Sequence, residues 1–109
     1  MYTTRWRFKT ARFTVTWDTE PETDPYLSWD ATGEVRANID SGRFECFTSR
    51  LSVTRNGHEV GMDYLSESIY ANPDDFRRNH IGARGDGSYF RDMVSEAIRD
   101  ARVTLAQGV

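Results

Sequence analysis

The sequence predicts an α+β fold in which a C-terminal helix covers one face of an antiparallel three-stranded sheet, with a short helix between strands 1 and 2. Three observations support this prediction. Apolar and polar residues alternate over 5–18, an Asn-Gly pair separates two further alternating runs, and apolar residues recur every three or four positions over 88–107. Alternation is typical of half-buried strands, and recurrence every three or four residues is typical of amphipathic helices. A chain of 109 residues can bury one modest core, so we expect a single domain.

The first strand is expected over residues 5–18. Its apolar positions on one face are Ala11, Phe13, Val15 and Trp17. Trp6 and Phe8 have the opposite parity. We therefore expect a bulge or bend near Thr10, because one inserted residue moves the later side chains to the other face.

A short helix is expected next, over residues 28–42. Ser28 or Asp30 can cap its first turn, and Gly42 stands just past its end, where glycine often terminates helices. The inward stripe of this helix would be Trp29, Val35 and Ile39.

The clearest local signal is Asn56-Gly57, which favours a two-residue type I′ hairpin turn within residues 43–65. Such a turn sets the register of the two strands. The facing pairs that we expect are Val53 with Val60, Leu51 with Met62, and Ser49 with Tyr64. The side chains expected on the other, wet face are Arg50, Ser52 and Thr54.

Two helices complete the prediction. Residues 70–80 begin a short one, with Asn72 as its N-cap and Pro73 in the first helical position. A glycine-rich segment over 81–88 then breaks the chain before the last helix. The apolar stripe of that helix, expected to cover the sheet, is Phe90, Met93, Val94, Ala97, Ile98, Ala101 and Leu105.

Composition narrows the class of function. The net charge of −3, from 17 acidic and 14 basic residues, predicts no bulk attraction to nucleic acid or to an anionic membrane. No apolar segment has the length of a membrane helix or the form of a secretory signal, so we expect a cytoplasmic protein. Cys46 is the single cysteine, which excludes an internal disulfide and agrees with a reducing compartment.

Four carboxylates occupy alternate positions in the segment "DTEPETDPY": Asp18, Glu20, Glu22 and Asp24. EF-hand calcium loops also alternate their ligands, but they need glycine at the sixth position and glutamate at the twelfth. This chain has Thr23 and Trp29 there. We therefore expect no bound metal and no cofactor.

Two interpretations of these carboxylates stay open. In an extended segment they share one face at a spacing of roughly 6.6 Å, and this strip of charge could meet a protein partner or occupy a basic nucleic-acid channel. Alternatively, Pro21 and Pro25 exclude helix and the segment is a solvated loop. If the segment is functional, the partner-binding surface should combine it with neighbouring exposed strand residues.

A second candidate is an anion-binding site formed by Arg77, Arg78 and Arg84 before the last helix. Alternatively, the glycines there only turn the chain so that this helix can dock. Neither common nucleotide-binding fingerprint is present. The arginines and aromatics of "RWRF", residues 5–8, could stack on bases, although a strand with core Trp and Phe explains the same pattern.

No catalytic constellation is recognised in the sequence. Neither His58 nor His80 is linked to a nucleophile motif, and Cys46 lies in a predicted strand with the parity of a packed residue. No carboxylate pair has the apolar setting of a general acid. We expect no enzymatic activity.

The segments "NGHEVGMDYLSESIYANPDDF" and "GSYFRDMVSEAIRDAR" resemble a family of small uncharacterised proteins carried by tailed phages and prophages of proteobacteria. The resemblance extends from about Arg12 onward, and it implies no catalytic motif. Small acidic phage proteins of this kind are similar to anti-CRISPRs, which occupy a protein surface or imitate nucleic-acid charge. This chain departs from a typical DNA mimic because it is less acidic and its basic residues are spread from end to end.

The resemblance and the composition together predict a phage-encoded protein-binding module that inhibits a host defence complex, such as a CRISPR effector, by occupying a protein surface. A nucleic-acid-associated accessory protein that uses Arg77, Arg78, Arg84 and the "RWRF" strand is an alternative. Another is a homo-oligomeric structural or regulatory phage protein. Both a monomer and a homodimer are compatible with the sequence.

Overall fold

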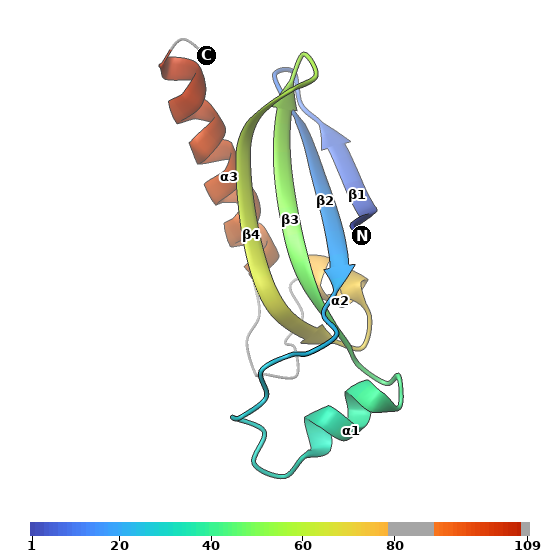
Figure 1. The fold of residues 1–109 in the computed structure, drawn as a ribbon. Coiled ribbons are helices and arrows are strands. Elements are labelled where there is room, and N and C mark those ends of the chain that lie inside the picture. The colour runs from blue at the N-terminus through green and yellow to red at the C-terminus, as the bar shows by residue number, and fades with distance from the viewer. Residues whose placement is uncertain (79–88, 108–109) are drawn as a thin grey trace.

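A computed structural model describes residues 1–78 and 89–107 (Figure 1). The elements are β1 Thr3–Lys9, β2 Thr14–Pro21, α1 Glu34–Asp40, β3 Glu45–Arg55, β4 His58–Tyr70, α2 Pro73–Arg77 and α3 Tyr89–Ala106. The four strands form one antiparallel sheet in the order β1-β2-β3-β4. The α+β class, the antiparallel sheet and the C-terminal helix are confirmed. The prediction of three strands is wrong.

The additional strand arises because the segment predicted as one strand is a hairpin. The amide of Thr10 donates to the carbonyl oxygen of Phe13 at 2.7 Å, which closes a turn between β1 and β2. Across this hairpin, Trp6 lies opposite Trp17. The change of parity near Thr10 therefore marks a reversal of the chain, which places residues of opposite parity on the same face. Of the bulge or bend predicted near Thr10, the bend is present, at residues 11 and 12, and the bulge is not. A register shift lies instead between Thr4 and Trp6.

The predicted place of the short helix, between strands 1 and 2, is also wrong. Only the turn described above joins β1 and β2. Within the segment predicted as this helix, α1 forms between β2 and β3 and begins after Gly33, whose φ is 77°; the other short helix, α2, follows β4. No residue of α1 is fully buried. Of its predicted inward stripe, Val35 and Ile39 are half-buried, whereas Trp29 lies before the helix and is exposed. Figure 1 shows α1 beyond the end of the sheet rather than over one of its faces.

The β3–β4 turn is confirmed, but the register that was predicted from it is wrong. Asn56 and Gly57 have φ of 53° and 78°, as a type I′ turn requires. A register shift after the second residue pair then places Val53 opposite Gly61. The observed pairs that replace the other two predictions are Leu51 with Asp63 and Ser49 with Leu65.

Helix packing explains this register. A Cβ atom on Gly61 would lie 2.3 Å from the carbonyl oxygen of Ala97 and 2.8 Å from the amide nitrogen of Ala101. The backbone of α3 therefore approaches β4 more closely than any side chain larger than hydrogen permits. The bulge brings the one glycine of β4 to this contact.

The core lies between the sheet and the two helices α2 and α3. Its buried members include Val15, Trp17, Leu51, Val53, Phe76, Phe90, Met93, Ala97 and Ala101. The predicted stripe of α3 is confirmed, with Val94, Ile98 and Leu105 partly buried at its margins. The start of α2 is confirmed as well, because the Asn72 side chain accepts from the amide of Asp75 at 3.1 Å.

Candidate functional site

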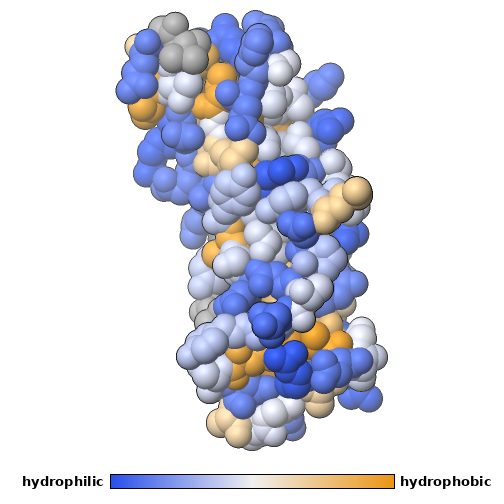
Figure 2. All heavy atoms as spheres, in the orientation of Figure 1, coloured by the Kyte–Doolittle hydropathy of each residue, from blue (hydrophilic) through white to orange (hydrophobic). Residues whose placement is uncertain are grey.

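One of the two faces of the sheet has no helix of the described residues over it (Figure 1). On β2 and β3, Trp17 and Leu51 face the core, so their neighbours in sequence point the opposite way. We call this side the open face; it is formed by Thr4, Arg7, Thr16, Asp18, Arg50, Ser52, Met62 and Tyr64. Figure 2 shows a mainly hydrophilic surface, with apolar side chains visible toward both ends of the molecule, including the end that carries α1.

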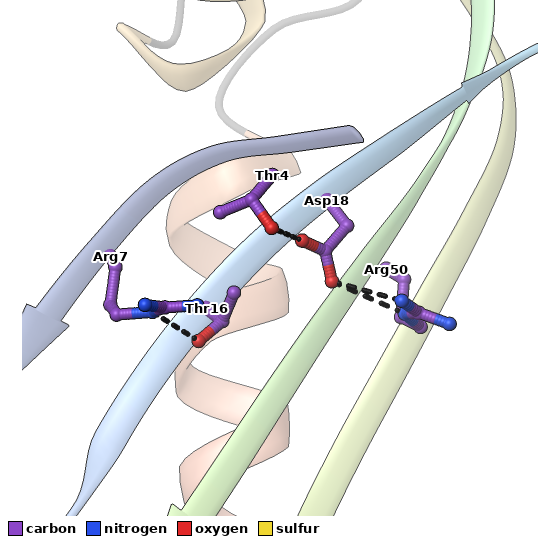
Figure 3. A network of polar contacts seen from close by, with 5 residues as sticks. All are labelled: Thr4, Arg7, Thr16, Asp18 and Arg50. Carbon is purple, nitrogen blue, oxygen red and sulfur yellow. Dashed lines mark hydrogen bonds and ion pairs between the residues drawn. The ribbon is translucent and has the colours of Figure 1, made fainter. Parts of the chain in front are cut away.

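A polar network occupies the middle of the open face (Figure 3). Asp18 is only 6% exposed, and both of its carboxylate oxygens accept hydrogen bonds. Thr4 Oγ1 donates to Oδ1 at 2.6 Å, and Arg50 Nη2 donates to Oδ2 at 3.1 Å. A buried carboxylate is stable only when it is paired in this way. The chemical role of Asp18 is therefore to anchor Arg50.

Arg50 is held from two sides. Its guanidinium carbon lies 4.0 Å from the centroid of the Tyr2 ring, within the range of a cation–π contact. Partial burial by itself lowers the pKa of Arg50, but the hydrogen bond that Arg50 donates to Asp18 and the charge of Asp18 raise that pKa above the usual value. Burial also raises the pKa of Tyr2, with the charge of Glu20 acting in the same direction. The open face thus presents a fixed cation beside a neutral phenol.

The four carboxylates predicted to form one strip have different surroundings. Strand β2 continues to Pro21, so Asp18 and Glu20 belong to the sheet and not to a loop. Glu20 accepts from the amino group of Met1 at 2.6 Å. Glu22 lies beyond the strand, and Asp24 is exposed to solvent. The uniform spacing of an extended strip therefore holds only for the first two carboxylates.

Glu22 and Glu67 fasten the segment after β2 to the sheet. Glu22 Oε1 accepts from the hydroxyl of Thr48 and, at 3.0 Å, from the amide of Glu67. Glu67 has a φ of 55°, and its Oε1 accepts from the amide of Tyr26 at 2.9 Å. Sequence reasoning missed Glu67, because a β-bulge that exposes an amide at this position has no signal in the local pattern.

Residues 22–44, which we call the α1 lobe, project from the end of the sheet (Figure 1). The lobe contains five acidic and two basic residues. Tyr26 is 69% exposed, Trp29 is 36% exposed, and Val35 and Ile39 are half-buried. A pocket of about 260 Å³ lies between the lobe and the sheet, and its walls include Ile39, Phe44 and Phe47 together with the charged residues Arg5, Glu22 and Glu45. This combination of acidic and exposed aromatic groups suits recognition of another surface.

Two arginines of the predicted anion site form ion pairs with the same carboxylate, that of Asp74. Arg77 Nη2 lies 2.9 Å from Asp74 Oδ1, and Arg78 Nε lies 2.7 Å from Asp74 Oδ2. Their charge is therefore partly neutralised within α2. Arg84, the third member of the predicted site, lies outside the described residues.

Cys46 and His58, the residue types of a nucleophile and a base, lie at opposite ends of the β3–β4 hairpin. Cys46 is buried, and His58 is exposed at the β3–β4 turn; His80 lies outside the described residues. No group of three or more potential metal-ligating side chains is found in residues 1–78 and 89–107. Within the same ranges, no helix combines the length and apolar character needed to cross a bilayer.

Comparisons with known proteins return no match: no family model, no curated protein and no solved structure is similar to this chain. The fold and the surface geometry define it as a four-stranded α+β protein with one open sheet face. The resemblance to phage accessory proteins stays a prediction.

Proposed function

We propose that this chain is a protein-binding module that inhibits its partner by occupying the partner's surface, and that the open face and the α1 lobe make the contact. The observation that carries the proposal is Tyr64, 53% exposed, paired across β3 and β4 with the anchored Arg50. Tyrosine and arginine are enriched at protein interfaces, and they supply much of the binding energy there.

Preorganisation supports this role for the open face. The ion pair with Asp18 and the contact with Tyr2 hold Arg50 in one position before any partner arrives. A side chain that is already ordered loses less conformational entropy when it binds. Thr16 and Ser52 are half-buried on the same face, and their hydroxyl groups can donate and accept hydrogen bonds.

The α1 lobe supports the same proposal and indicates the charge of the partner. Glu20, Glu22 and Asp24 lead from the open face into the lobe, whose own balance is acidic. Complementary charge speeds association and selects partners, and its effect weakens as salt rises. The surface therefore suits a partner with a basic patch.

The partner class that we propose is a host defence complex in the bacterial cytoplasm. CRISPR effectors hold nucleic acid in positively charged channels, and an acidic lobe with exposed aromatic anchors fits the surface around such a channel. The sequence resemblance to phage accessory proteins favours the same class. The chain would block the partner sterically and would not modify it covalently.

Site-specific photo-crosslinking tests the contact. A photoreactive phenylalanine analogue is placed at Tyr64 and, as a matched control, at Val103 on α3, which is 52% exposed. In cells that carry an active CRISPR system, we expect an adduct to a defence protein from position 64 only. Equal adducts from both positions, or none from position 64, would reject the open face as the contact.

Affinity and activity then test the mechanism. With the captured partner, Tyr64→Ala should weaken binding at least about tenfold, equivalent to about 1.4 kcal/mol, whereas Val103→Ala should not. Replacing Glu20, Glu22 and Asp24 with Ser should weaken binding more at low salt than at high salt.

A plating assay tests inhibition in cells. Expression of the chain should restore phage plating on the immune host, and Tyr64→Ala should reduce the number of plaques. Binding to DNA in a low-salt mobility shift would favour the nucleic-acid alternative instead.

A further inference from the structure

Strand β1 forms one edge of the sheet. It pairs with β2 on one side, and no segment of the described chain pairs with its outer side. Figure 1 shows β1 at the margin of the sheet farthest from α3. An edge strand presents unpaired amide and carbonyl groups, which can accept a further strand from another chain.

A groove with aromatic side chains runs beside this edge on the helix side. Helix α3 packs chiefly on β4 and β3, so Trp6 and Phe8 of β1 remain half-buried. These rings, with Phe90, Arg91, Val94 and Ser95 of α3 and Arg77 of α2, line a pocket of about 300 Å³. The Trp6 ring centroid lies 4.7 Å from that of Phe8 and 5.3 Å from that of Phe90. The groove thus has an aromatic wall along β1, with the side chains of Arg77, Arg91 and Ser95 at its margin.

The same edge carries an excess of positive charge. Residues 1–17 contain four basic residues, Arg5, Arg7, Lys9 and Arg12, and no acidic one. Within the residues that the structure describes, none of the four forms an ion pair. Arg7 Nε donates to the hydroxyl of Thr16 at 3.3 Å (Figure 3). These cations are therefore available to carboxylates from outside.

Strand geometry arranges the two properties on opposite sides of the edge. Trp6 and Phe8 lie opposite the core residues Trp17 and Val15, whereas Arg7 and Lys9 lie opposite Thr16 and Thr14 on the open face. A strand added to β1 would place alternate side chains on these two sides. One set would enter the aromatic groove and the other would meet the cations.

We propose that the β1 edge binds an extended segment of a partner protein in which acidic and apolar residues alternate. The acidic side chains pair with Arg7 and Lys9, and the apolar ones pack on Trp6 and Phe8. The β1 strand of a second copy does not fit, because its own arginines and lysine would face these cations and repel them. This site goes beyond the proposed function and does not depend on Tyr64 or the α1 lobe.

A peptide-binding assay tests this proposal. The probe is a short fluorescent peptide in which glutamate and valine alternate, and the control peptide has the same composition with all glutamates placed before the valines. Fluorescence polarisation at low salt should show binding of the alternating peptide and much weaker binding of the control. Equal binding of both peptides, or no binding of the alternating one, would overturn the proposal.

Charge-reversal variants locate the site. Arg7→Glu combined with Lys9→Glu should weaken binding of the alternating peptide by about tenfold or more, because two attractions become repulsions. The matched control, Arg99→Glu combined with Arg102→Glu on α3, should change it by less than about twofold. Equal effects of the two pairs would mean that the peptide responds only to overall charge.

Hydrogen exchange tests the added strand itself. The alternating peptide should slow exchange of amides in β1 but not in α3, since a new strand supplies acceptors to the free edge. Unchanged exchange in β1 would overturn the strand model.

Competition with a single-stranded oligonucleotide tests the nucleic-acid alternative. If the oligonucleotide displaces the peptide and its own binding is lost in the Arg7→Glu, Lys9→Glu variant, the edge is a nucleic-acid site and the proposal fails.

Discussion

The two faces of the sheet are built from the same strands but have opposite properties. Val15, Trp17 and Leu51 are at most 1% exposed beneath the helices, whereas Thr16 and Ser52, beside them in sequence, remain half-buried on the open face. Neighbouring positions therefore have separate roles, because side chains alternate along a strand. The covered face forms the buried core, and the open face leaves side chains accessible to solvent.

One residue on each side departs from this division. Asp18 belongs to the open face yet is almost fully buried. Asp63 lies opposite Leu51 on the helix side, yet it is a carboxylate that forms no ion pair within residues 1–78 and 89–107. These two aspartates test whether the contrast between the faces is complete.

The largest expected effect comes from the centre of the covered face. Phe76 is 1% exposed, and its ring lies 5.5 to 6.0 Å from those of Trp17, Phe47, Tyr70 and Phe90. Phe76→Ala should lower the free energy of unfolding by about 3–5 kcal/mol, measured by chemical denaturation. Tyr64→Ala on the open face should change it by less than about 0.5 kcal/mol. Similar losses from both substitutions would contradict the division of roles.

The next effect concerns the contact between β4 and α3. Gly61→Ala should destabilise the protein by about 3 kcal/mol, because the new Cβ meets backbone atoms of α3 that no rotamer change can move away. Adding Ala101→Gly removes only the contact with the Ala101 Cβ at 3.0 Å and should restore little stability. Full recovery in the double variant, measured by denaturation, would show that side chains and not backbones set the spacing.

Gly61 also shows how far the sequence can predict this fold. Local signals were sufficient for the Asn56-Gly57 turn, the Asn72 cap and the stripe of α3, because neighbouring residues determine each of them. The register of β4 depends on a tertiary contact with α3, and the local pattern contains no information about it. The β1–β2 turn was missed because its sequence has no glycine or proline and the change of parity also fits a bulge.

In the candidate site, too, the sequence predicts only the features that neighbouring residues determine. The exposed position of Asp24 and the wet face around Arg50 follow from local composition and alternation. The burial of Asp18 does not, since it depends on Thr4 from β1 and Arg50 from β3. Pairings between segments far apart in the chain decide which of several similar carboxylates is structural.

Asp18→Asn tests the exception on the open face. The asparagine keeps the shape but loses the charge that pairs with Arg50, whose own side chain is 30% exposed and can regain water. We therefore expect a loss of about 1–2 kcal/mol, smaller than for a fully buried pair. Glu20→Gln on the same strand should cost less than about 0.5 kcal/mol. Thermal denaturation compares the two variants, and an equal cost for both would mean that Asp18 is an ordinary surface residue.

Asp63→Asn should produce the smallest effect, and with the opposite sign. Partial burial, together with the charges of Glu96 and Asp100, raises the pKa of Asp63 above its usual value of 3.8, although a hydrogen bond from the Tyr64 amide lowers it. The charged carboxylate is thus less favourable in the folded protein than in the unfolded chain.

At neutral pH, the asparagine should therefore raise the free energy of unfolding by less than about 1 kcal/mol. The gain should shrink as pH falls through the raised folded-state pKa and vanish below 3.8, where Asp63 is protonated in both states. Denaturation across this pH range measures it, with Asp92→Asn as the control at an exposed site on α3. A loss of stability at neutral pH would contradict this prediction. It would show that the hydrogen bond from the Tyr64 amide to the charged Asp63 stabilises the fold by more than burial and the charges of Glu96 and Asp100 destabilise it.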